Sequence, residues 1–91
     1  MKLDAGSITL DNAAALLPLG IDAIRGGDTV IDLAQVREVD SAAVALLIAW
    51  QREAQVAGTT LDFAGVPEGI ASLARLYGVA ALLGIGRNHE P

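Results

Sequence analysis

The longest apolar run in the chain extends from Ala42 to Trp50 and predicts a helix. The run is longer than a typical buried strand, and its alanines and leucines are strong helix formers. Asp40 and Ser41 come directly before it, and both residue types accept hydrogen bonds from the free N–H groups at a helix start. We therefore predict a helix from Ser41 to about Ala57, with Asp40 or Ser41 as its N-cap.

The apolar residues of this predicted helix occupy more than one of its sides. Val44, Leu47 and Ile48, continued by Gln51, recur at the spacing of a stripe that faces a core. Four positions off that stripe are also apolar: Ala42, Ala45, Leu46 and Ala49. A small domain cannot cover both sides of such a helix with its own chain, and an exposed apolar face marks a partner site. We expect the outer face to contact a partner at four positions: Ser41, Ala42, Ala45 and Ala49.

The rest of the chain alternates between strand-like and helix-like patterns. The expected segments are one or two short strands in residues 2–10, strands at 29–33 and 60–64, a connecting turn at 34–38, and helices near 13–25 and 67–77. Pro18 interrupts the first helix, which should bend near Leu17 or divide into two pieces. The order ββαβαβα predicts an α/β sandwich with a largely parallel or mixed sheet.

Composition excludes several classes of function. A chain of 91 residues predicts one domain with a modest core. The absence of cysteine excludes disulfides and cysteine-based metal sites, and a net charge of −5 opposes binding to nucleic acid or anionic lipid. The longest apolar run is half of a membrane span, and the first residues do not form a signal peptide. We therefore expect a cytoplasmic protein.

No catalytic arrangement is evident in the sequence. Asp32 and Asp40 would need a converging base or metal ligand, and none accompanies them. The single histidine, His89, is expected to be solvated, and the Gly-Ile-Gly triplet at 84–86 is too short for a dinucleotide fingerprint. We expect no catalytic residue, no metal ion and no cofactor. Trp50 is expected to pack in the core or at its rim.

Residues 30–48, with the sequence VIDLAQVREVDSAAVALLI, resemble the signature region of the STAS domain family. The shared pattern is a hydrophobic strand ending in Asp-Leu, a short turn, an Asp-Ser pair, small residues and an apolar helix. The segments LLPL at 16–19 and LARLY at 73–77 are most similar to one branch, the small cytoplasmic STAS subunit of Mla-type phospholipid ABC transporters. The chain differs from the family at Ala43, where glycine is usual.

The resemblance implies a STAS-like α/β sandwich, with helices packed on a mixed, mostly parallel sheet of about four or five strands. The chain itself predicts a single domain over residues 1–84 and a frayed tail over 85–91. The resemblance also implies a docking module and not an enzyme, with Asp40 and Ser41 in the partner interface. Tyr77 would either pack in the core or, by resemblance, lie at the edge of that interface.

The partner implied by the resemblance is the ATPase subunit of an ABC transporter that maintains the lipid asymmetry of the outer membrane. The chain would then be peripheral to the inner membrane through its partner only, with no contact to nucleic acid. The alternative is an anti-sigma-factor antagonist in which a partner kinase phosphorylates Ser41. From the residues alone, helix capping would explain Ser41; with the resemblance, an interface role is preferred.

Overall fold

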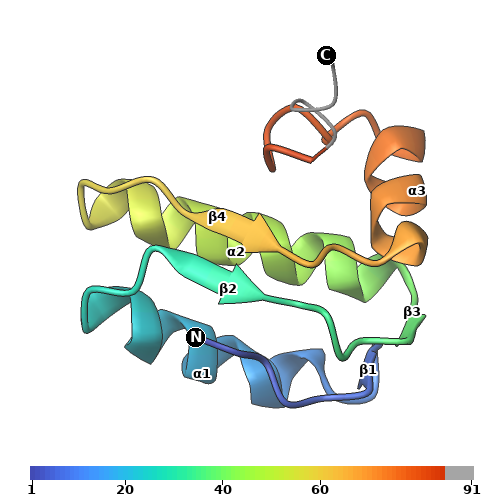
Figure 1. Cartoon of the computed structure of the whole chain (residues 1–91), viewed down its shortest axis with the longest axis horizontal. Coiled ribbons are helices and arrows are strands. Elements are labelled where there is room, and N and C mark those ends of the chain that lie inside the picture. The colour runs from blue at the N-terminus through green and yellow to red at the C-terminus, as the bar shows by residue number, and fades with distance from the viewer. Residues whose placement is uncertain (86–91) are drawn as a thin grey trace.

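The computed structural model describes residues 1–85, which alternate between short strands and helices (Figure 1). In chain order the elements are β1 (Ser7–Ile8), α1 (Ala13–Arg25), β2 (Val30–Asp32), β3 (Glu38–Val39), α2 (Ser41–Val56), β4 (Asp62–Ala64) and α3 (Glu68–Leu76). The three predicted helices are present within one residue of their expected ends. The predicted α/β class is confirmed.

Within residues 1–85, the strand pairs are all parallel. β1 pairs with β3, and β2 pairs with β4. Lys2 forms an isolated parallel bridge with Asp32, and the Leu3 N–H donates to the Asp32 carbonyl oxygen at 2.9 Å. In the N-terminal segment, Lys2 and Leu3 therefore lie beside β2, and Ser7 and Ile8 lie beside β3. Parallel pairing follows from the connections, because a helix intervenes between the two strands of each pair.

The strand order differs from the prediction. Residues 2–10 contain one strand and an isolated bridge, and β3 lies where the sequence predicted the end of a connecting turn. The observed order is βαββαβα. β3 is only two residues long, and it is a strand because it pairs with β1, about 30 residues earlier in the chain. Its own two residues are too few to predict a strand.

Helix α1 continues through Pro18 without a break, so the two-piece alternative is wrong. Proline removes one backbone hydrogen bond from a helix. Here tertiary packing compensates for that loss, because Leu16, Gly20 and Ile24 are buried along one side of α1. A further restraint comes from α2, whose Trp50 Nε1 donates to the Leu17 carbonyl oxygen at 2.9 Å.

The predicted core stripe of α2 is confirmed. Val44, Leu47 and Gln51 are buried, and Ile48 is half-buried. The Gln51 amide is satisfied by the backbone of Leu61, since Nε2 donates to the carbonyl oxygen at 3.0 Å and the Leu61 N–H donates to Oε1 at 3.3 Å. This exchange joins α2 to the segment that leads into β4.

The second apolar side of α2 is covered in part by the chain itself, contrary to the prediction from the sequence. Helix α1 lies beside α2 (Figure 1). Leu46 and Trp50 of α2 are buried, Trp50 completely. Trp50 lies over Gly20 so closely that a Cβ atom at Gly20 would collide with the indole ring. The uncovered part of α2 is therefore narrower than predicted.

The end of the described chain adds to the core. Leu83 and Ile85 are buried, and the Ile85 N–H donates to the Ala80 carbonyl oxygen at 2.8 Å. The remainder of the expected tail, with His89, lies outside the described residues. None of the helices within residues 1–85 is long and apolar enough to cross a membrane.

Candidate partner-binding surface

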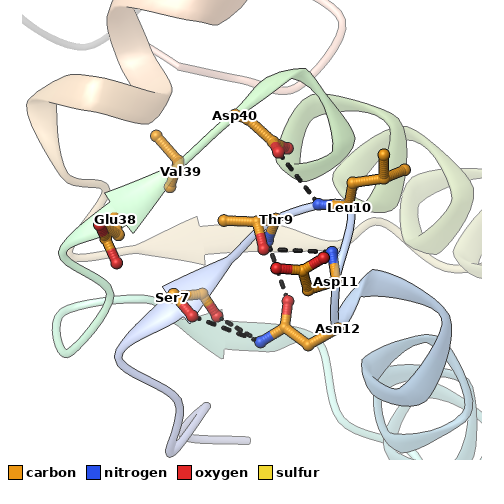
Figure 2. A pocket seen from close by; sticks show the side chains of 8 residues that line it. All are labelled: Ser7, Thr9, Leu10, Asp11, Asn12, Glu38, Val39 and Asp40. Atoms are coloured by element: carbon orange, nitrogen blue, oxygen red, sulfur yellow. Dashed lines mark hydrogen bonds between the residues drawn. The ribbon is translucent and has the colours of Figure 1, made fainter.

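Asp40, and not Ser41, is the N-cap of α2. Its Oδ1 accepts a hydrogen bond from the Ala42 N–H at 2.8 Å, and its Oδ2 accepts one from the Leu10 N–H at 3.0 Å (Figure 2). One carboxylate thus begins the helix and also holds the loop between β1 and α1. Ser41 is the first helical residue and is exposed, and its hydroxyl has no hydrogen-bond partner within residues 1–85.

The loop between β1 and α1 is held by its own polar side chains. Asn12 Oδ1 accepts from the Thr9 N–H at 2.9 Å, and Asn12 Nδ2 donates to the Ser7 carbonyl oxygen at 2.9 Å. Thr9 Oγ1 accepts from the Asp11 N–H at 3.2 Å. These bonds, together with the contact to the α2 cap, fix the backbone around Leu10 (Figure 2). The Leu10 side chain is nevertheless 82% exposed, which makes it an ordered apolar projection beside the start of α2.

A polar hollow of about 450 Å³ opens where β1 and β3 end and the helices begin. Its lining residues are Ser7, Thr9, Leu10, Asp11, Asn12, Glu38, Val39 and Asp40 (Figure 2). Three of them are acidic and none is basic, so we call it the acidic hollow. Its carboxylates repel phosphate groups, which argues against a nucleotide site. No group of acidic, histidine or cysteine side chains within residues 1–85 could hold a metal ion.

A second, apolar hollow of about 230 Å³ lies between α1 and α2. We call it the alanine groove; its lining residues are Ala13, Ala14, Leu17, Ala42, Ala45, Leu46 and Ala49. The two helices run in the same direction, because Leu17 contacts Trp50 and, further along, Arg25 Nε forms an ion pair with Glu53 Oε2 at 2.8 Å. Small side chains along both helices leave their backbones near the surface, so another helix can approach closely.

The structure brings most of the predicted site residues to one surface. Ala42, Ala45 and Ala49 line the alanine groove. Asp40 and Ser41 lie at the end of the groove where α2 begins. Ala45 and Ser41 are exposed, whereas Ala42 and Ala49 are half-buried.

Three other positions considered in the sequence lie elsewhere. Tyr77 follows α3, is 53% exposed and lines neither the groove nor the acidic hollow, so its interpretation as a core residue is wrong. Ala43, at the position where the family usually has glycine, is fully buried and faces away from this surface. Asp32, the other acid considered for catalysis, accepts from the Ala34 N–H at 2.9 Å, an arrangement that shapes a turn.

Sequence reasoning missed the contribution of α1. Ala13, Ala14 and Leu17 join this surface because α1 packs beside α2, and Leu10 lies next to it because its N–H donates to Asp40 Oδ2. The only sign of this surface in the local sequence is a leucine, Leu10, between polar residues. The sequence does not show that its side chain is exposed; that follows from the fold.

Comparison with known proteins agrees with this architecture. The family model described as "Mlab, STAS domain" matches residues 4–84, which is nearly the whole chain. No curated protein matches the chain with significant similarity. STAS domains are protein-interaction or regulatory modules and are generally non-enzymatic. The chain belongs to the STAS domain family that this model describes.

Proposed function

We propose that this protein is a non-enzymatic subunit that binds and supports the ATPase of a phospholipid-transporting ABC complex. The observation that carries the proposal is the alanine groove, an apolar hollow left uncovered on a domain from a family of interaction modules. The likeness of residues 16–19 and 73–77 to the transporter branch supports the specific partner. In this function the protein is held at the cytoplasmic side of the inner membrane by its partner alone.

The composition of the groove suits docking. Covering apolar surface is favourable by roughly 25 cal/mol per Å². Alanine loses no side-chain rotamer freedom when a partner covers it, so little of that gain is offset by ordering. The five alanines lie on two helices that are already packed together, and the surface therefore exists before binding.

A second candidate function is the phospho-switch of an anti-sigma-factor antagonist. It is favoured by the exposed Ser41 hydroxyl in the first turn of α2, where the helix dipole stabilises a phosphate. It is opposed by Asp40 next to it in the chain and by the acidic hollow at the same end of α2. Mass spectrometry of the protein from its own cells distinguishes the two functions, because phosphate on Ser41 would favour the switch.

The proposal is tested with the variant Ala45→Glu. Ala45 is exposed and lines the groove, so glutamate should be tolerated in the helix and the free energy of unfolding should change by less than about 0.5 kcal/mol. Docking would bury the new charge without a partner, and binding should be lost. The measurement is affinity capture from native membranes, with the ABC ATPase quantified by mass spectrometry, beside thermal unfolding of the purified chain.

Gln55→Glu is the matched control, since it introduces the same charge at an exposed position of the same helix outside the groove. It should retain the ATPase. If Ala45→Glu unfolds the protein, this face of α2 belongs to the core. If the variant is stable and still captures the ATPase, the binding surface is elsewhere. If the unmodified chain captures no ABC ATPase, the partner assignment is wrong.

A further inference from the structure

The acidic hollow and the alanine groove meet at one end of α1 and α2. Asn12 lines the hollow and the next residue, Ala13, lines the groove; on the other strand-to-helix connection, Asp40 lines the hollow and Ala42 the groove. From this juxtaposition we infer that the partner docks an amphipathic helix, with small or apolar side chains along the groove and a lysine or arginine entering the acidic hollow. This inference rests on the proposed function and adds the chemistry of the partner's contacting element.

The lining of the groove favours a helix over an extended segment. Its residues are alanine and leucine on α1 and α2, whose backbone groups are mostly bonded within the helices or at their caps; the exception is the Ala14 carbonyl, to which Pro18 cannot donate. An extended chain laid there would bring N–H and C=O groups to a surface that offers them few partners, at a high cost in desolvation. A helix satisfies its own backbone and presents only side chains. From Ala42 to Ala49 the groove extends for about 10 Å along α2, which is about two helical turns.

The negative charge of the acidic hollow predicts a basic residue at the end of the partner helix that lies over it. Asp11 and Glu38 are exposed, and their carboxylates accept no hydrogen bond within residues 1–85. No basic side chain lines the hollow. When a partner covers the adjoining groove, the carboxylates lose part of their water, and a cation from the partner restores their stabilisation.

The same charges argue against a second copy of this chain as the occupant. In a symmetric dimer across the groove, the acidic hollows of both copies would lie near the interface. Each chain also carries a net charge of −5, which adds to the repulsion. A basic helix from a different protein meets no such opposition.

The first test reverses charges one at a time in the full chain and measures its affinity for the ATPase recovered by capture, at low and high salt. Asp11→Lys and Glu38→Lys should each raise Kd by about tenfold or more at low salt, and the effect should shrink at high salt. The matched control is Asp22→Lys, an exposed acid on α1 outside both hollows with the same change in net charge. Its Kd should stay within about twofold. Equal effects for all three variants, or none for Asp11→Lys and Glu38→Lys, would overturn the inference.

The second test identifies the contacting segment. A photoreactive leucine analogue at position 10 preserves the shape of a side chain that is 82% exposed beside the hollow. Cross-linking should map to a partner helix with apolar residues at three- and four-residue spacing and a lysine or arginine near the link. A link to an acidic or extended segment contradicts the inference, as does a link to a second copy accompanied by a concentration-dependent dimer in sedimentation.

These outcomes separate the inference from the proposed function. If the cross-linked helix belongs to a protein that is not an ABC ATPase, the proposed function fails and the inference stands. If the ATPase is captured but contacts the chain through another kind of element, the inference fails and the proposed function stands.

Discussion

The packing between α1 and α2 is closed at one end and open at the other. At the closed end Trp50 is fully buried over Gly20, and its indole nitrogen donates to the carbonyl oxygen of Leu17. At the open end alanines from both helices face one another and leave the alanine groove. Both ends are apolar, so hydrophobicity alone does not distinguish them.

The difference between the two ends is one of side-chain size. A large ring opposite a glycine fills the space between two helices to the density of a protein interior. Small side chains opposite small side chains leave surface that only another molecule can cover. The same pair of helices therefore contributes stability at one end and, under the proposed function, a docking surface at the other.

The largest effect on stability is expected at the closed end, for Gly20→Ala. The added Cβ would collide with the Trp50 ring, which is rigid, buried and hydrogen-bonded, so the helices must separate or the indole must move. We expect a loss of about 1–3 kcal/mol in the free energy of unfolding, measured by urea denaturation. The control is Gly6→Ala, because nothing lies within 4 Å of a Cβ atom there and its φ is not positive. Equal losses in both variants would show that the contact with Trp50 is not what closes this end.

An intermediate effect is expected for Asp40→Ala, at the boundary of the open end. The substitution removes the N-cap of α2 and the bond to the Leu10 N–H, and should cost about 1–2 kcal/mol. Hydrogen exchange at the amides of Leu10 and Ala42 should accelerate more than exchange in the middle of α2. Ser41→Ala should change stability by only a few tenths of a kcal/mol, since Ser41 is not the cap. A larger loss for Ser41→Ala than for Asp40→Ala would contradict the observed cap.

The smallest effect on stability is expected inside the groove, and it sharpens the comparison most. Ala14 and Ala15 are consecutive, exposed residues of α1, but only Ala14 lines the groove. Ala14→Glu and Ala15→Glu should each change the free energy of unfolding by less than about 0.5 kcal/mol. Partner affinity, measured by titration with the captured ATPase, should be lost in Ala14→Glu and retained in Ala15→Glu. Retention in both would place the interface outside the groove.

Local patterns in the sequence were sufficient for the helices and for the buried side of α2. Helix hydrogen bonds join residues four apart, so the signals for α2 and α3 lie within the segments themselves. The same reasoning identified the small-residue side of α2, where Ala45 is exposed and Ala42 and Ala49 are half-buried. It failed where one segment depends on another: β3 exists through its pairing with β1, and α1 continues through Pro18 because it packs on α2.

The sequence by itself therefore determined the α/β class, the helices and the small-residue strip at Ala42, Ala45 and Ala49. Tertiary structure decided which part of that strip stays uncovered, because α1 buries Leu46 and Trp50 and adds its own alanines beside the rest. It also chose Asp40 over Ser41 as the cap, since the second carboxylate oxygen bonds to the distant Leu10 N–H. Each of these decisions depends on contacts between residues far apart in the chain, and no local pattern of hydrophobic and polar residues records them.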